Sequence, residues 1–434
     1  MKRIIITLLT AALILSAASC GIDATTENAI AATGKAETTA AEPTATEEAE
    51  EEKEIPADSE YVIENGVTDR MIALSRLNVG NRARLAKVFK KAQSGEKITV
   101  AYLGGSITQG SGAGNELCYA RLTTDWLMEK FPSAEIEYVN AGIGATGSYI
   151  GVYRTDRDVL CHNPDLVFVD FSVNDTTENT QRNIASYDGV LRKLWAAESA
   201  PAIVTIAMTM DNGTSFQQYH SEICKAYDIP MISYKDAILD VIKNGHIKWT
   251  DISDDNIHPN VAGHKVLTQL ITAYLQDVID NLDSIDTENE SDFSAVYASD
   301  KYSSAELLIP EKAEPAACEG WETKTDSFGN FGGYWRLRTS DGTLEGVTPL
   351  TFEVEAKSVG VFYGRLVKGG STFDVIVDGT VAKTIDSSFE GGWGNYVEAA
   401  EVIDFEECGK HTIEIVPHEG EKSITLISAI AITK

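Results

Sequence analysis

The sequence is poor in basic residues and in cysteine, and each shortage excludes a class of protein. It has 36 Lys and Arg against 66 Asp and Glu, a formal net charge of −30 over 434 residues. Such a surface repels polyanions, so we expect no nucleic acid partner and no docking on anionic lipid. The six cysteines are scattered, which is the pattern of neither a disulfide framework nor a metal site. Whether Cys318 and Cys408 form a disulfide with each other is left open by the sequence.

The glycine-rich segment "VAYLGGSITQGSGAGN", Val100 to Asn115, lacks the patterns of nucleotide binding. Gly110, Gly112 and Gly114 form G-x-G-x-G instead of G-x-G-x-x-G, and no Walker Gly-Lys-Ser/Thr is present. Ser106 is followed by Ile-Thr, so the G-x-S-x-G elbow of α/β-hydrolases is also missing. Because no HExxH or similar ligand spacing occurs either, we expect no metal and no cofactor.

The first twenty residues, "MKRIIITLLTAALILSAASC", have the pattern of an export signal. Lys2 and Arg3 form a basic start, and the apolar run from Ile4 to Leu15 is too short to span a membrane. The ending resembles a bacterial lipoprotein signal, which implies a lipidated Cys20, a place on the bacterial surface and membrane contact only through this anchor. Simple secretion is the alternative. Residues 21–59, rich in Thr, Ala and Glu, are predicted to be a disordered acidic tether.

Apolar runs alternate with helical patterns between residues 60 and 281. The runs "KITVAYLG", "EIEYVNA", "DLVFVDF" and "AIVTIAM" are largely apolar, and amphipathic segments separate them. Strands buried on both faces and joined by helices indicate a parallel sheet between two helical layers. We therefore predict a three-layer α/β/α, flavodoxin-like domain over 60–281, followed by a polar linker over 282–301.

From residue 302 the apolar pattern changes to a period of two. "LTFEVEA" and "HTIEIVPHE" alternate, and Asp378–Gly379 within "VIVDGTVAK" is a strong hairpin signal. No long helical pattern appears. Residues 302–434 are therefore predicted to form a β-sandwich of jelly-roll type.

Reactive side chains follow the ends of the predicted parallel strands. Ser106 follows the first strand and Asn174 the third, and Asp255 and His258 lie near the end of the domain. Ligands bind at the carboxyl ends of strands in an open parallel sheet, so we expect these residues to meet at one edge. A serine needs an imidazole as base, and the imidazole needs a carboxylate to fix its tautomer. The set predicts acyl transfer, with main-chain amides and the Asn174 side chain stabilising the oxyanion.

Four segments in order, "YLGGSITQG", "NAGIGATGS", "FSVND" and "DNIHPN", resemble the four blocks of the SGNH (GDSL-like) hydrolase superfamily. The resemblance implies Ser106 as nucleophile and one oxyanion donor, Asp255 and His258 as its triad partners, and Asn174 as a further oxyanion donor. The second-block donor falls on Ala145 or on Gly144 beside it, and both stay open. Gly105 stands where the family has Asp.

Aromatic residues in glycine-rich segments of the predicted sandwich indicate a substrate class. Trp393 and Tyr396 lie in "SSFEGGWGNYVE", and Trp335 lies in "SFGNFGGYWRLR". Such rings either stack on sugars or fill the sandwich core. Arg154 is either a further substrate contact or part of a surface salt bridge. The arrangement resembles bacterial SGNH carbohydrate esterases, which implies removal of O-acetyl groups from plant-cell-wall polysaccharide or oligosaccharide of the xylan or mannan type.

Two alternatives stay open at this point. A lipase or lysophospholipase on the same scaffold should have an apolar lid, and no hydrophobic loop of that kind is found. A non-catalytic glycan-binding surface protein would not need all four reactive residues intact. Of the other histidines, His162, His220 and His246 are expected on the surface or in loops, and His264 in the last helix.

Overall fold

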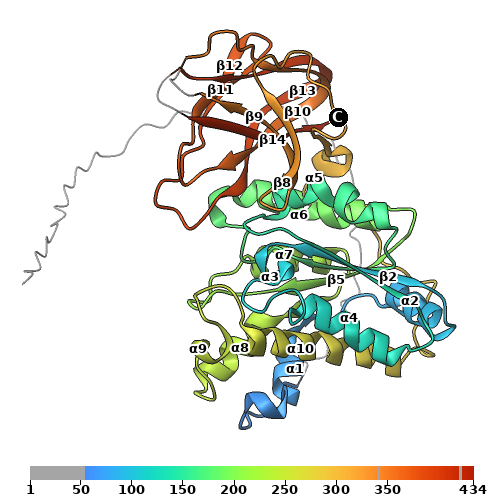
Figure 1. Ribbon diagram of the computed structural model, residues 1–434. Coiled ribbons are helices and arrows are strands. Elements are labelled where there is room, and N and C mark those ends of the chain that lie inside the picture. Colours follow the sequence, from blue (N-terminus) through green and yellow to red (C-terminus); the bar gives the residue numbers. More distant parts are fainter. Residues whose placement is uncertain (1–53, 340–342, 420–422) are drawn as a thin grey trace, which may run out of the picture. The chain divides into compact units, whose positions relative to one another are not determined.

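The computed structural model describes residues 54–339, 343–419 and 423–434, and residues 54–434 form one compact unit (Figure 1). The predicted export signal, the predicted lipidation site Cys20 and the predicted tether up to residue 53 lie outside the described residues. Within the described part of the chain, no helix combines the length and the apolar character needed to cross a membrane.

A six-stranded sheet lies at the centre of the α/β domain, in the order β1-β6-β5-β4-β2-β3. Five strands are parallel: β2 (Ile98–Gly104), β3 (Ile136–Gly142), β4 (Leu166–Asp170), β5 (Ala202–Ala207) and β6 (Met231–Ser233). Their order is that of flavodoxin-like folds. The edge strand β1 (Arg76–Asn78) runs antiparallel to β6 and was not predicted, because three residues carry no readable periodicity.

Helices cover both faces of this sheet, so the predicted three-layer architecture is confirmed (Figure 1). One face carries α1 (Asp69–Ser75), α2 (Ala83–Gln93), α4 (Tyr119–Lys130), α8 (Tyr234–Lys243) and α10 (Val261–Asp280). The other carries α5 (Ser148–Asp158), α6 (Thr180–Trp195) and α7 (Gln217–Ala226). The remaining helices are short: α3 (Ser106–Gln109), α9 (Trp249–Ile252), η1 (Ile63–Asn65), η2 (Leu160–His162), η3 (Thr177–Asn179) and η4 (Lys301–Ser304).

The C-terminal domain is the predicted antiparallel β-sandwich. Its strands are β7 (Glu306–Leu308), β8 (Glu322–Phe328), β9 (Gly332–Arg338), β10 (Leu350–Arg365), β11 (Thr372–Val377), β12 (Thr380–Asp386), β13 (Tyr396–Pro417) and β14 (Ile424–Thr433). Their order is β12-β11-β13-β10-β14-β9-β8, and β7 pairs with β14. Register shifts along the two long strands β10 and β13 allow the bending that a sandwich needs. Asp378 and Gly379 form the predicted hairpin turn, with φ angles of 51° and 77°.

The two domains share one hydrophobic core. Tyr149 and Tyr153 of α5 pack edge-on against Phe362 of β10, with ring centroids 6.0 and 5.6 Å apart. Gly360 of β10 is needed at this contact, because a Cβ there would lie 2.6 Å from the Tyr149 hydroxyl. The sandwich is therefore packed directly on the α5–α6 layer (Figure 1).

The predicted linker and the end of the predicted tether both lie against the α/β domain. In the linker, the Phe293 ring stacks on Trp195 and Tyr227, with centroids 4.7 and 4.0 Å apart. In residues 54–59, the Asp58 carboxylate lies 3.0 Å from His246 Nε2. Aromatic and charged partners elsewhere in the chain hold these segments, and the polar composition of the segments themselves does not reveal such partners.

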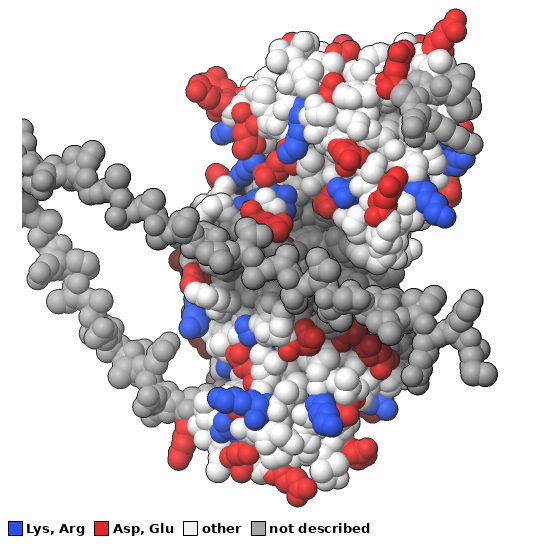
Figure 2. Space-filling view, turned by 90° about the vertical axis from the view of Figure 1, so that its left-hand side faces the viewer, with Lys and Arg blue, Asp and Glu red and all other residues white. Residues whose placement is uncertain are grey.

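The described cysteines all carry free thiols, so Cys318 and Cys408 do not form a disulfide. On the face shown in Figure 2, acidic side chains are spread over both domains with basic ones between them, and no extended basic area lies on its described part.

Candidate active site

The turn after β2 places Ser106 at the first position of the short helix α3. Two glycines make the turn tight: a Cβ on Gly104 would lie 2.1 Å from Thr108 Oγ1, and one on Gly105 would lie 2.1 Å from Asn174 Oδ1. Asn174 follows β4, the neighbour of β2 in the sheet. The strand order reverses between β2 and β4, and such a switch point is where ligands bind in open α/β sheets. The close approach of Asn174 also explains why glycine occupies position 105.

Ser106, His258 and Asp255 form one hydrogen-bonded chain. Ser106 Oγ lies 2.9 Å from His258 Nε2, and His258 Nδ1 lies 2.7 Å from Asp255 Oδ2. The other oxygen of Asp255 accepts the main-chain N–H groups of Ile257 and His258, each at 2.7 Å. The three side chains that the sequence predicts to act together therefore meet, between the end of β2 and the loop before α10.

The surroundings of Asp255 keep it ionised. Partial burial would raise the pKa of this carboxyl, but the His258 ring and the two N–H groups outweigh that effect and lower the pKa below its ordinary value. An ionised Asp255 can only accept hydrogen bonds, so His258 Nδ1 must donate to it. In the neutral imidazole, Nε2 is then an acceptor for the Ser106 hydroxyl, which is the tautomer that a general base requires.

A pocket of about 640 Å³ opens above these residues and has walls from both domains. The α/β domain contributes Ser106, Gln109, Ser111, Gly144, Ala145, Val173, Asn174, Asp255, Asn256, Ile257 and His258. The sandwich contributes Gly329, Asn330, Trp393, Asn395 and Tyr396. Among the residues that the structure describes, no three His, Cys, Asp or Glu side chains gather into a potential metal site.

The candidate oxyanion donors lie along one wall of this pocket. The Gly144 N–H donates to the side-chain oxygen of Gln109 at 2.7 Å, so an acyl oxygen would have to displace Gln109 to use it. Ala145 has a φ of 61°, in the left-handed region that favours glycine, and it stands where the SGNH pattern has glycine. Asn174 also lines the pocket. The structure thus brings both second-block candidates and Asn174 to Ser106.

The two tryptophan predictions have different outcomes. Trp393 is 72% exposed, lines the pocket and stacks on Tyr396 at a centroid distance of 5.0 Å. Trp335 is 0% exposed and packs edge-on against Phe352 inside the sandwich. Its prediction as a substrate contact is wrong, because the alternation of side chains along β9 directs it into the core.

The prediction of a substrate contact or surface salt bridge at Arg154 is also wrong. The side chain is fully buried, and its guanidinium donates to the carbonyls of Ala141 at 2.6 Å and Gly104 at 2.8 Å. Asp158 lies 3.2 Å away as its ionic partner. Arg154 therefore ties together the carboxyl ends of β2 and β3, from which the Ser106 turn and the 142–147 loop begin.

Two histidines expected to be unremarkable are buried in hydrogen-bonded positions. His220, expected on the surface or in a loop, lies in α7 with Nε2 2.9 Å from Asp175 Oδ2. His264 lies in α10 as predicted, accepts the Tyr119 N–H at 3.1 Å and approaches the Ser111 carbonyl with its other nitrogen. Burial lowers the pKa of His264 to about 4. Sequence spacing gave no signal for either contact, because each partner lies far away along the chain.

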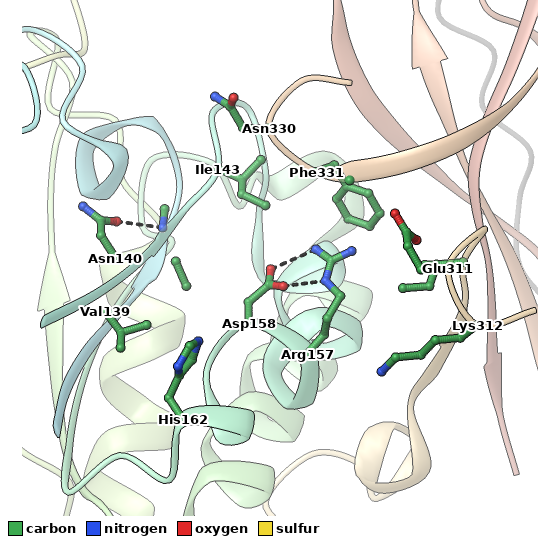
Figure 3. Close-up of a pocket in the computed structure, with 14 residues that line it drawn as sticks. Val139, Asn140, Ile143, Arg157, Asp158, His162, Glu311, Lys312, Asn330 and Phe331 are labelled. Carbon is green, nitrogen blue, oxygen red and sulfur yellow. Dashed lines mark hydrogen bonds and ion pairs between the residues drawn. The ribbon is translucent and has the colours of Figure 1, made fainter. Parts of the chain in front are cut away.

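Two further hollows adjoin the pocket. One, of about 310 Å³, shares Asn174, Trp393 and Tyr396 with it. The other, of about 630 Å³, shares Asn330 with it and lies between β3 and the β8–β9 turn. Figure 3 shows the Arg157–Asp158 pair within this second hollow, with His162 on one side and the C-terminal domain on the other. Each hollow therefore shares part of its wall with the pocket that Ser106 lines.

Comparisons with known proteins agree with this architecture. Residues 102–266 match the family described as GDSL-like Lipase/Acylhydrolase. A two-domain esterase (CEX) active on acetylated mannans is similar in structure, with a TM-score of 0.76 and 29% identity over 84% of this chain and 98% of that one. The same esterase co-crystallised with mannopentaose matches with a TM-score of 0.75, at the same identity and coverage. No curated protein sequence matches the chain.

Proposed function

We propose that this carboxylic ester hydrolase, whose residues 102–266 match the GDSL-like lipase/acylhydrolase family, removes O-acetyl groups from plant-cell-wall polysaccharide. The substrate class is acetylated mannan or xylan, as polymer or oligosaccharide. One observation carries the proposal: the Ser106–His258–Asp255 chain lies in a pocket that is also lined by the exposed Trp393 and the half-buried Tyr396 of the sandwich.

The geometry supports the following reaction. His258 Nε2 takes the hydroxyl proton as Ser106 Oγ attacks the acetyl carbon, and Asp255 stabilises the imidazolium. The tetrahedral intermediate collapses, its bond to the sugar oxygen breaks, and His258 returns the proton to that oxygen. An acetyl-Ser106 remains. A water molecule, deprotonated by His258, attacks it, and acetate leaves as Ser106 regains its proton.

Three groups are proposed to stabilise the oxyanion: the Ser106 N–H, a main-chain N–H at Gly144 or Ala145, and the Asn174 side chain. Each donor in such a set is worth about 10²–10³ in rate. Asn174 is well placed because it packs on Gly105, directly before the nucleophile.

The substrate class rests on the aromatic wall and on the neighbouring hollows. The exposed face of Trp393 offers a flat apolar surface of the kind that packs on sugar rings. The two hollows that share lining residues with the pocket leave room for sugar units next to the acetylated one. The similar two-domain esterase is active on acetylated mannans, which favours mannan over xylan.

Acetate release from acetylated mannan and xylan tests the proposal, with acetylated pectin and chito-oligosaccharide as comparisons. Wild type should release acetate from mannan or xylan, and Ser106→Ala should release none above background. Equal release by the two proteins would overturn the mechanism. Preference for long-chain acyl esters over acetylated glycans would indicate a lipase-type enzyme instead. Failure of a fluorophosphonate probe to label wild type would indicate a binding protein.

We also propose that the protein is exported and anchored through a lipidated Cys20. The support is the pattern of the first twenty residues. In a bacterial host, Cys20→Ala should abolish incorporation of a labelled fatty acid while leaving esterase activity unchanged. Incorporation by the variant would contradict lipidation at this residue.

A further inference from the structure

Another Asp–His pair, Asp175 and His220, is buried next to the active-site pocket. Asp175 directly follows Asn174, and its Oδ2 lies 2.9 Å from Nε2 of His220 on α7. The side chains are 1% and 0% exposed. The His220 ring stacks on Tyr187, with centroids 3.6 Å apart and planes inclined by 9°. Neither side chain lines the pocket that holds Ser106, although Asp175 is among the residues around the adjoining hollow of about 310 Å³. An effect of the pair on the chemistry at Ser106 would therefore pass through neighbouring residues.

Asp175 joins the two segments that carry the oxyanion donors. Its Oδ1 accepts the N–H of Ser148 at 2.8 Å, at the end of the loop that holds Gly144 and Ala145. The carboxylate also packs on that loop, since a Cβ on Gly147 would lie 2.5 Å from Oδ1. On the other side, Asn174 is its neighbour in the chain. One carboxylate thus links the Asn174 side chain to the 144–147 loop.

His220 holds the second oxygen of this carboxylate. An ionised Asp175 can only accept hydrogen bonds, so His220 Nε2 has to carry a proton. His220 Nδ1 is buried and has no hydrogen-bond partner among the described residues, so a proton there would be an unsatisfied donor. The neutral imidazole with its proton on Nε2 is therefore the form that suits the site, and it prevents Asp175 from turning away from Ser148.

We propose that Asp175 and His220 are positioning residues of the oxyanion hole. They set the separation between the Asn174 side chain and the main-chain amides of the 144–145 loop. The proposal rests on the proposed function, because it needs Asn174 as an oxyanion donor. Donors preset where negative charge develops speed the chemical step, and small misplacements of such groups are costly. Loss of the pair should therefore lower kcat and leave KM almost unchanged.

His220→Leu tests this directly, because it removes the donor and puts an apolar side chain in the buried space of the imidazole. With 4-nitrophenyl acetate, kcat should fall about 10- to 100-fold and KM should change less than about twofold. His220→Gln supplies an N–H₂ donor and should recover much of the lost kcat. If His220→Leu does not fold, Asp175→Asn takes its place, since it keeps the shape and the bond to Ser148 but loses the charge.

A double-mutant cycle with Asn174→Ala separates positioning from a general structural effect. If His220 acts through Asn174, then His220→Leu should cost far less in the Asn174→Ala background than in wild type. If the two losses multiply instead, His220 does not act through Asn174 and the proposal is overturned. An unchanged kcat in His220→Leu would overturn it as well.

Tyr227→Phe is the matched control. Its hydroxyl donates to the buried carboxylate of Asp188 on α6 at 2.7 Å, so the variant also removes a donor from a buried carboxylate. Asp188 holds the linker through the N–H groups of Ala298 and Ser299 and does not line the pocket. Tyr227→Phe should lower the melting temperature without lowering kcat. An equal fall in kcat for Tyr227→Phe and His220→Leu would mean that loss of stability explains both.

Failure of the proposed function gives a different result. Full activity of Ser106→Ala would contradict the assignment of Ser106 as nucleophile. Full activity of Asn174→Ala would contradict the assignment of Asn174 as oxyanion donor, and this inference would then fail as well. Failure of the positioning role alone leaves both of those variants inactive or weak while His220→Leu stays fully active.

Discussion

Two Asp–His pairs in this protein have similar separations but use different ring nitrogens, Nδ1 of His258 and Nε2 of His220, and their surroundings are opposite. Asp255 and His258 lie 2.7 Å apart at the pocket, and Asp175 and His220 lie 2.9 Å apart behind it. His258 is 27% exposed and has Ser106 on its second nitrogen, whereas His220 is 0% exposed and has no partner on its second nitrogen. The first pair can pass a proton to a bound ester, and the second can only hold its neighbours. The role of an Asp–His pair therefore depends on its exposure and on whether a further group, such as the Ser106 hydroxyl, binds the second ring nitrogen.

Trp393 and Trp335 show the same contrast between the open pocket and the closed interior. Both lie in glycine-rich segments with several other aromatic residues. Trp393 is 72% exposed beside the candidate catalytic residues, and Trp335 is 0% exposed in the sandwich core. Substitution of Trp393 should therefore change activity, and substitution of Trp335 should change stability.

The largest expected effect is at His258. His258→Ala should lower kcat/KM for 4-nitrophenyl acetate by about 10⁴-fold or more, because it removes the base that lies 2.9 Å from Ser106 Oγ. Its melting temperature should stay close to that of wild type, since the side chain is partly exposed. A variant that keeps more than about 1% of the wild-type rate would contradict the assignment of the base.

Trp335→Ala should give the largest change in stability. Emptying this fully buried site should lower the free energy of unfolding by about 3–5 kcal/mol, measured by urea denaturation. Trp393→Ala is the matched control, and its exposed side chain should change the same quantity by less than about 0.5 kcal/mol. A similar loss of unfolding free energy in both variants would contradict the difference in burial between Trp393 and Trp335.

His264→Gln should remove one contribution to the dependence of stability on pH. Burial lowers the pKa of His264 from its ordinary 6.5 to about 4, so the unfolded chain binds a proton there more readily than the folded protein does. This stabilisation is complete above about pH 6.5 and is lost as the pH falls toward 4. Between pH 7 and pH 5, wild type should therefore lose about 2 kcal/mol more than the variant.

Urea unfolding of both proteins at the two pH values measures this difference. The comparison with wild type is needed because burial raises the pKa of Asp170 to about 7, which changes stability in the opposite direction. The same pH dependence in both proteins would contradict a buried neutral imidazole at position 264.

The smallest expected effect is at Trp393. Trp393→Ala should raise KM for acetylated mannan about tenfold, since one exposed stacking surface is worth roughly 1–1.5 kcal/mol. With 4-nitrophenyl acetate, which has no sugar chain, kcat/KM should change less than about twofold. An equal loss on both substrates would show that Trp393 supports the pocket and does not bind sugar.

Much of the fold and of the candidate site follows from local patterns. Apolar runs separated by helices predict the parallel sheet, and a period of two predicts the sandwich, because these periodicities reflect which faces are buried. Ser106, Asn174, Asp255 and His258 are recognisable since each follows a strand or lies in a short loop with a distinctive sequence. In an open parallel sheet, these positions converge on one edge.

The burial of single side chains depended on partners far away along the chain. Arg154 is buried because the carbonyls at the ends of β2 and β3 accept its N–H groups. His220 is buried because Asp175, 45 positions earlier, supplies an acceptor. The sandwich contributes Trp393 to the pocket because Phe362 and Gly360 pack on Tyr149 of α5. Local sequence thus specified the elements and the reactive residues, whereas packing between distant segments selected which of them face the substrate, since burial is a property of what lies against a residue in space.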